Sequence, residues 1–300
     1  MLNAWLLLPD LLLIVIGAAL CRFTALGRPI WDAVERLVYY LLFPILLFNS
    51  ILKSALDPQQ TVGLASCGVA TVLFGITLAY ATRLWPGVDA RLHAAGAQTA
   101  FRFNSFIALA LAERLQGVQG VAWMALIIAL CVPLCNVAAV WPLARHGGHA
   151  YGRELVRNPL IVATVAGLLA NLVGVRLPAP VDTTLQRIGL AALPLGLMAV
   201  GAGLRFGGLR ESPGLAGTLL AIRHVALPIF ALALSSVLGL SAAQRTIVIA
   251  FAALPTAPSA YVLALRMGGN GAYVAAIVTL STLLGMLSLP SWLAVLSVLP

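Results

Sequence analysis

The sequence predicts an all-α polytopic membrane protein, and three observations lead to this fold class. Of its 300 residues, 61% are apolar and only 9% are charged, and the mean hydropathy is +1.02. A soluble domain of this length carries charge on roughly a quarter of its residues. Its apolar runs reach the roughly 20 residues that a helix needs to cross about 30 Å of hydrocarbon. The alternating pattern of an outer-membrane barrel does not occur, so the spans are expected to be helices.

Prolines, glycines and charged residues divide the apolar sequence into ten predicted helices. Those of the first half are Trp5–Leu20, Val34–Leu52, Val62–Leu84, Leu92–Leu115 and Val118–Leu143. Those of the second half are Pro159–Val173, Leu185–Leu204, Leu215–Leu238, Ala243–Arg266 and Ala272–Val298. The first run is expected to be a retained helix rather than a signal peptide, because it lacks a positive segment and contains Pro9 and Asp10.

The longest polar connection, ARHGGHAYGRELVRN, lies between the fifth and sixth predicted helices. Superposing the two halves brings Pro44 opposite Pro194 and Asn104 opposite Thr256. Because each half has an odd number of helices, the second must enter the membrane from the opposite side. The sequence therefore predicts two inverted five-helix repeats, an architecture typical of secondary transporters. The predicted units are residues 1–143, the cytoplasmic connecting loop 144–158 and residues 159–300.

The distribution of arginine predicts the orientation. Most of the Lys and Arg residues flank the odd-numbered connections, so these connections are expected in the cytoplasm and both termini in the periplasm. The predicted location is the plasma membrane, as a multi-pass protein of a bacterial inner membrane. The net charge of +9 comes from residues between spans rather than from a continuous basic stripe, so no nucleic-acid partner is expected. The lipid bilayer is the expected partner, and the sequence leaves open whether the protein forms a homodimer.

Two predicted helices are interrupted by polar residues or prolines near their middle. In the fourth helix the run AQTAFRFNS contains Arg102, Asn104 and Ser105. In the ninth, ALPTAPSAY places Pro255 and Pro258 on either side of Thr256. Each proline removes an N–H and clashes with the carbonyl four residues earlier, so the ninth helix is expected to unwind there. Unwound backbone at this depth is tolerated only inside protein or around a cavity; a packed proline kink is the alternative.

Arg102 is the residue that most needs an explanation. An arginine near the centre of a span costs roughly 2.5–3.5 kcal/mol on insertion scales. The ends of broken helices expose N–H groups and positive partial charge, which attract anions. We expect Arg102 to hold an anion at the break, although pairing with Asp10 or extension to the interface is the alternative.

Four further residues are weaker candidates. Asn49 in the second helix is expected to contribute a hydrogen bond to the site. Arg223 and His224 in the eighth helix could line the same cavity, couple transport to an ion or serve structurally. Asp10 is a further coupling candidate, because carboxylates inside membranes are rarely without function; its shallow position argues against it.

Other chemistry is not indicated. The cysteines at 21, 67, 131 and 135 have no metal-binding spacing and are expected to pack as small residues. His146 and His149 lie in a glycine-rich loop without other ligands, so no metal site is predicted. No nucleophile elbow, phosphate loop or HExxH motif occurs, and neither an enzyme nor a cofactor is expected.

Several segments carry a resemblance: FRFNSFIALALAE, RNPLIVATVAGLLANLVG, ALPLGLMAVGAGL and ALPTAPSAYVLALRMGG. In this order along the whole chain they resemble the auxin efflux carrier family, specifically its bacterial members. The resemblance implies ten helices in two inverted repeats, crossing broken helices four and nine, and one helix group that moves against another as an elevator. It implies an organic anion as substrate: auxin in plants, with malate or malonate proposed among bacteria.

Two departures limit what the resemblance implies. The long hydrophilic loop of the plant carriers is replaced here by the short 144–158 connection, which puts regulation by phosphorylation in doubt. Sodium coupling of the bile-acid-transporter kind usually needs acidic or amide oxygens at the crossover, and no carboxylate occurs there. Proton coupling or uncoupled flux stays equally open.

The sequence thus predicts a secondary active transporter of a small organic anion such as a mono- or dicarboxylate. The site is expected to contain Arg102, Asn104, Ser105, Pro255, Thr256, Pro258 and Asn49. The alternatives are an anion channel, which would need a continuous polar lining, or a membrane-embedded sensor of the same fold.

Overall fold

The computed structural model describes residues 8–53, 58–144, 159–204 and 209–298, and these residues are almost entirely helical. Within this part of the chain, six helical segments are long and apolar enough to cross a membrane. The predicted class, an all-α protein with several membrane spans, is therefore confirmed at this level.

The helices in the first half of the chain overlap the first five predicted segments, with different boundaries. The second span consists of two α-helices joined by a π-helical turn, and the fourth is interrupted. The elements are α1 (Leu8–Phe23), α2 (Arg28–Leu37), η2 (Val38–Leu42), α3 (Phe43–Lys53), α4 (Pro58–Ala81), η3 (Thr82–Leu84), α5 (Ala90–Gly96), η4 (Ala97–Ala100) and α6 (Ser105–Ala144).

The helices in the second half overlap the other five predicted segments, again with one π-helical turn and one interruption. The elements are α8 (Pro159–Leu172), α9 (Ala179–Ala202), η5 (Leu209–Glu211), α10 (Pro213–Ala221), η6 (Ile222–Ala226), α11 (Leu227–Val237), α12 (Ala242–Ala252), α13 (Ser259–Arg266) and α14 (Gly271–Val298).

The predicted boundary between the fourth and fifth spans lies inside α6. Gln116 and Gly117 have non-helical backbone angles there, and Gly117 has a φ of 56°. A positive φ is readily adopted by glycine and strains other residues. Gly117 thus lets the chain change direction within the segment LQGVQG, although no separate loop connects the two parts of α6.

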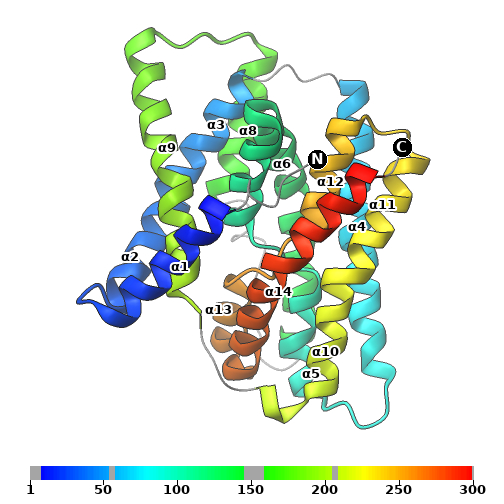
Figure 1. The fold of residues 1–300 in the computed structure, drawn as a ribbon. Helices are drawn as coiled ribbons and strands as arrows, with labels where there is room; N and C mark the ends of the chain where they lie inside the picture. Colours follow the sequence, from blue (N-terminus) through cyan, green and yellow to red (C-terminus); the bar gives the residue numbers. More distant parts are fainter. Residues whose placement is uncertain (1–7, 54–57, 145–158, 205–208, 299–300) are drawn as a thin grey trace.

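The helices form two groups that lie side by side (Figure 1). In what we call the α9 group, α1, α2 and α3 pack against α9, and α8 packs against α3. In the α12 group, α4 packs with α6, α11 and α12, while α13 and α14 pack together. The helix α6 lies between the groups, because it contacts α3 and α9 as well as α4 and α12.

Glycines bring α1 and α9 into close contact. A Cβ atom on Gly17 would lie 1.9 Å from the carbonyl oxygen of Met198, and one on Gly201 would lie 1.8 Å from that of Ile14. Both distances are far below a van der Waals contact, so any side chain at these positions would force the helices apart. Close approach of this kind is how small residues stabilise helix pairs in membranes.

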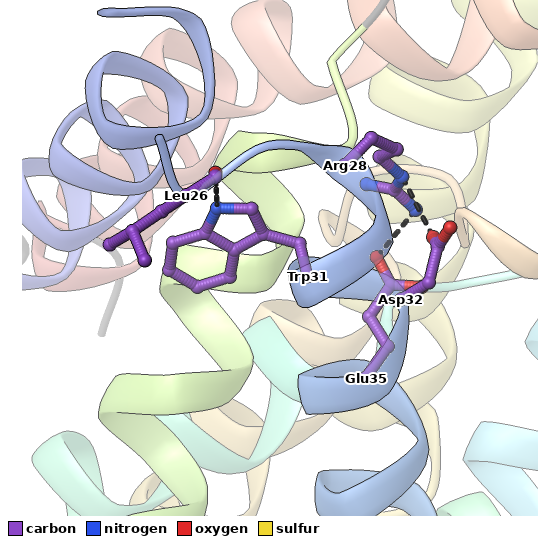
Figure 2. A network of polar contacts seen from close by, with 5 residues as sticks. All are labelled: Leu26, Arg28, Trp31, Asp32 and Glu35. Carbon is purple, nitrogen blue, oxygen red and sulfur yellow. Dashed lines mark hydrogen bonds and ion pairs between the residues drawn. The ribbon is translucent and has the colours of Figure 1, made fainter. Parts of the chain in front are cut away.

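A polar network at the start of α2 ties this helix to the turn that precedes it (Figure 2). The Arg28 guanidinium pairs with Asp32 and Glu35, each at 2.9 Å, and the Trp31 indole N–H donates to the Leu26 carbonyl at 2.9 Å. Arg28 therefore provides both acidic residues of this helix start with an ion-pair partner.

Both π-helical turns come just before a proline in the next helix, Pro44 in α3 and Pro228 in α11. A proline ring clashes with the carbonyl four residues earlier in a regular α-helix. A π turn inserts one additional residue and is frequent near functional sites. In the second half, this turn contains Arg223 and His224.

Candidate functional site

The two predicted interruptions are present in the structure. Residues 101–104 leave the helix between η4 and α6, and residues 253–258 do so between α12 and α13. Pro255 and Pro258 explain the second break, since neither supplies an N–H to a helix. In the first break, the Asn104 side-chain oxygen accepts hydrogen bonds from the backbone N–H groups of Phe106 at 3.0 Å and Ile107 at 3.2 Å. Asn104 thus caps α6 and fixes its start.

The two breaks cross and pair with each other. Phe103 and Thr256 form an isolated antiparallel β-bridge, so each break supplies backbone partners to the other. This pairing satisfies polar groups that unwinding would leave unpaired in hydrocarbon. The flanking backbone hydrogen bonds run from Asn104 N to Pro255 O at 2.9 Å and from Ala257 N to Arg102 O at 3.4 Å.

Thr256 lies at the centre of this crossing and is fully buried. Its hydroxyl donates to the Thr99 carbonyl at 2.6 Å, and its backbone N–H donates to the Ser281 hydroxyl of α14 at 2.9 Å. Thr256 therefore joins three segments: the first break, the second break and α14.

Arg102 and Asn104 flank the bridge residue Phe103 in the first break. Because alternate residues on extended backbone share a face, their side chains are expected on one side of the crossing. The Phe103 ring packs against Phe251, with ring centroids 4.7 Å apart. One Arg102 nitrogen, Nη2, donates to the Ser259 hydroxyl at 3.0 Å.

The same two residues carry donors without a partner. Arg102 Nη1 and Asn104 Nδ2 are buried, and neither makes a hydrogen bond within the described residues. Buried polar groups in proteins are nearly always paired, so such groups need an explanation. These two unpartnered donors belong to residues of the same break, and one of them is cationic, so an anion bound at the break could accept a hydrogen bond from each.

Arg223, the second arginine inside a span, has a different environment. It is 1% exposed and donates to three carbonyls at the end of α12. The bonds run from Nε to Leu254 O at 2.5 Å and from Nη2 to Phe251 O at 3.1 Å and Ala252 O at 3.2 Å. A cation at a helix C-terminus is favourable, because the unpaired carbonyls there carry negative partial charge. Arg223 thus holds the end of α12 beside the break.

His224 follows Arg223 and points toward α14. Its ring nitrogens lie 2.9 Å from the hydroxyls of Ser281 and Ser288. Ser281 also contacts Thr256, so His224 is connected to the crossing through one side chain. Ser281 could not be identified from the sequence, because a serine in an apolar helix usually bonds its own backbone.

The remaining predicted residues are spread more widely. Ser105 and Pro258 lie beside the crossing, at the start of α6 and just before α13. Asn49 is buried on α3 and its side-chain oxygen has no partner among the described residues. The side chain of Asp10 and the whole of His146 and His149 lie outside the described residues, so their predicted roles stay untested.

A small apolar cavity of about 40 Å³ borders the crossing, between the α9 group and α14. It adjoins Pro255 of the second break and Ile107 of the first turn of α6. Its other lining residues are Ile14, Ala110, Leu111, Leu197, Thr282, Gly285, Met286, Leu289 and Pro290.

Neither metal ligation nor disulfide bonding is seen in the described residues. No cluster of three or more His, Cys, Asp or Glu side chains occurs in them. The cysteines are free, and Cys67, Cys131 and Cys135 are buried, as expected for small packing residues.

Comparisons with known proteins indicate the general class of the protein. The model of the family described as Membrane transport protein matches residues 145–293. An uncharacterized transporter of Methanothermobacter thermautotrophicus is 27% identical over 293 residues, which are 95% of this chain and 96% of that relative. Both findings confirm the resemblance found in the sequence and indicate a transport protein rather than an enzyme.

Proposed function

We propose that this chain, which is similar to the membrane transport protein family, is a secondary active transporter of a small organic anion. The observation that carries the proposal is the pair of buried, unpartnered donors on Arg102 and Asn104 at the crossing of two broken helices. A carboxylate bound there would accept one hydrogen bond from each. The Arg102 charge would compensate that of the anion.

The other predicted site residues take supporting roles in this proposal. Ser105 begins α6, whose N-terminal end faces the anion with positive partial charge. Pro255 and Pro258 keep the second break open, and Thr256 holds the two breaks together. Asn49 would meet the substrate from the α9 group.

The division into two helix groups supports alternating access. The second broken helix lies in the α12 group and α6 of the first packs against that group, whereas α1 and α9 form a closely packed pair in the α9 group. We propose that the halves are inverted five-helix repeats and that the α12 group moves past the α9 group as an elevator, which carries the anion across. The plasma membrane, periplasmic termini and a homodimer belong to the same proposal.

A channel is the second function to test. The polar groups of the crossing are interrupted by buried apolar residues such as Phe103 and Leu254 rather than forming a continuous lining. Conduction through a channel only dissipates a gradient. Accumulation of the anion against its gradient in proteoliposomes, driven by protons or sodium, would therefore separate the two.

The test begins with ligand binding. Purified protein is screened by thermal shift against mono- and dicarboxylates, with and without sodium, since a ligand that binds only the folded state raises apparent stability. Arg102→Met should weaken binding of the stabilising anion about 10- to 100-fold, the range for a lost hydrogen bond to a charged group. Arg176→Met, which removes an exposed arginine, is the matched control. Equal affinity in both variants would refute the proposed site.

A further inference from the structure

A chain of hydrogen bonds connects η6 to the crossing through α14. It contains five contacts among polar side chains and backbone groups. These are His224 Nδ1 to Ser288 Oγ at 2.9 Å, His224 Nε2 to Ser281 Oγ at 2.9 Å, Thr256 N to Ser281 Oγ at 2.9 Å, Thr256 Oγ1 to Ser281 Oγ at 3.1 Å and Thr256 Oγ1 to Thr99 O at 2.6 Å.

The direction of these bonds follows from counting hydrogens. The Thr99 carbonyl can only accept, so the Thr256 hydroxyl donates its hydrogen there. The contact between Thr256 Oγ1 and Ser281 Oγ then needs the hydrogen of Ser281. Because Ser281 has one hydrogen, its contact with His224 must be supplied by the ring, as Nε2–H.

This assignment leaves no contact without a hydrogen. Ser281 accepts from the imidazole and from the Thr256 backbone N–H, and it donates to the Thr256 hydroxyl. If Nε2 instead accepted from Ser281, the hydroxyls of Ser281 and Thr256 would face each other at 3.1 Å with no hydrogen between them. The chain of donors thus runs from His224 to Ser281 to Thr256 and ends on Thr99.

We propose that His224 is a positioning residue for the substrate site, which acts through Ser281 on Thr256. The imidazole orients the Ser281 hydroxyl, and this hydroxyl holds the backbone and side chain of Thr256. Thr256 is the bridge partner of Phe103, which stands between Arg102 and Asn104. His224 therefore sets the position of both anion-binding residues without touching the anion.

Several contacts hold His224 in place for this role. It lies in the π-helical turn η6, and its backbone carbonyl accepts from the Trp292 indole N–H at 2.9 Å. Its neighbour Arg223 is anchored on the end of α12. His224 is 5% exposed, and its ring lies between Ser281 and Ser288, which are about two turns apart on the same face of α14. Backbone and side chain are thus both fixed before the ring donates to Ser281.

The proposal makes a specific prediction for two substitutions of His224. The amide nitrogen of glutamine reaches about as far as Nε2, and the shorter amide of asparagine reaches only as far as Nδ1. His224→Gln should therefore keep the donor to Ser281 and bind the anion nearly as the wild type does. His224→Asn should weaken binding about tenfold, as should Ser281→Ala, because each removes a buried hydrogen bond.

Matched controls distinguish positioning from general damage and from proton transfer. Ser291→Ala removes a hydroxyl from the same helix, where it bonds only Leu287 of its own backbone, and should leave binding unchanged. A His224 that carried protons would lose coupled transport in the glutamine variant as fully as in the asparagine variant. Equal losses in these two variants would overturn the positioning role.

A measurement that needs no substrate separates this proposal from the proposed function on which it rests. Hydrogen exchange of the peptide that contains Thr256 reports whether its N–H remains bonded. Exchange should be faster in Ser281→Ala and His224→Asn and unchanged in His224→Gln and Ser291→Ala. This pattern, together with a wild type that binds no carboxylate, would refute the anion site and retain the positioning role. Unchanged exchange in Ser281→Ala would refute the positioning role.

Discussion

Replacing Arg223 by methionine tests whether an intramembrane arginine serves the fold or the substrate. Methionine replaces the aliphatic stem of arginine but has no donor. The substitution removes three hydrogen bonds to carbonyls at the end of α12. One of these carbonyls, that of Phe251, keeps a bond from Leu254 N at 3.3 Å. Within the described residues, the carbonyls of Ala252 and Leu254 would keep no other hydrogen bond.

The expected loss of stability follows from these two carbonyls. A buried acceptor left unpaired costs about 1–3 kcal/mol, so the two together cost about 2–6 kcal/mol. The variant no longer buries a cation, and the desolvation cost that it avoids offsets part of this loss of stability. A net loss of about 3 kcal/mol corresponds to a midpoint of thermal unfolding lower by about 6–12 °C, on the scale of single domains somewhat smaller than this chain.

The assay is thermal unfolding of purified protein in detergent, with Arg102→Met as the paired variant. The one bond that the Arg102 side chain makes in the described residues goes to the exposed Ser259 hydroxyl, so its loss should shift the midpoint by less than about 3 °C. Arg102→Met should lose anion binding and Arg223→Met should lose stability. The reasoning is refuted if Arg223→Met unfolds at the wild-type temperature and fails to bind the anion.

Two further substitutions test the packing of the α9 group. Gly201→Ala should lower the unfolding midpoint strongly, because its Cβ would lie 1.8 Å from a backbone oxygen. Gly217→Ala in α10 is the control: nothing lies within 4 Å of its Cβ, so this variant should unfold like the wild type or at a higher temperature. Asn171→Leu should cost about 1–3 kcal/mol, measured by the same unfolding assay. Its amide donates at 3.0 Å to two carbonyls at the end of α3, and an Asn171→Asp variant, which also lacks these donors, should show a similar loss.

The helical spans and their interruptions could be predicted because each has a local signal. The two prolines of ALPTAPSAY remove N–H groups within one helical turn, and this effect needs no tertiary contact. The fourth helix has no proline at its break. Asn104 marks that break instead, since its side chain caps the helix that follows.

The roles of Arg223 and His224 could not be predicted in the same way. Arg223 lies 28 to 31 residues from the carbonyls that it binds, and nothing in the α12 sequence marks those carbonyls as partners. His224 lies 57 and 64 residues from its two serines. Each contact depends on how helices far apart in sequence pack, so the sequence could only leave structural and coupling roles open.

Whether a polar residue inside a span belongs to the fold or to the site depends on which of its donors have partners. Arg223 and Thr256 are buried and hydrogen-bonded at several atoms, so removing either leaves protein groups unpaired and should lower stability. Arg102 and Asn104 each use one part of the side chain on the protein and leave a buried nitrogen unpartnered. An unpaired buried donor destabilises the empty protein, and a bound anion would relieve this cost. The residues that destabilise the empty crossing are therefore the ones expected to gain hydrogen bonds when substrate binds.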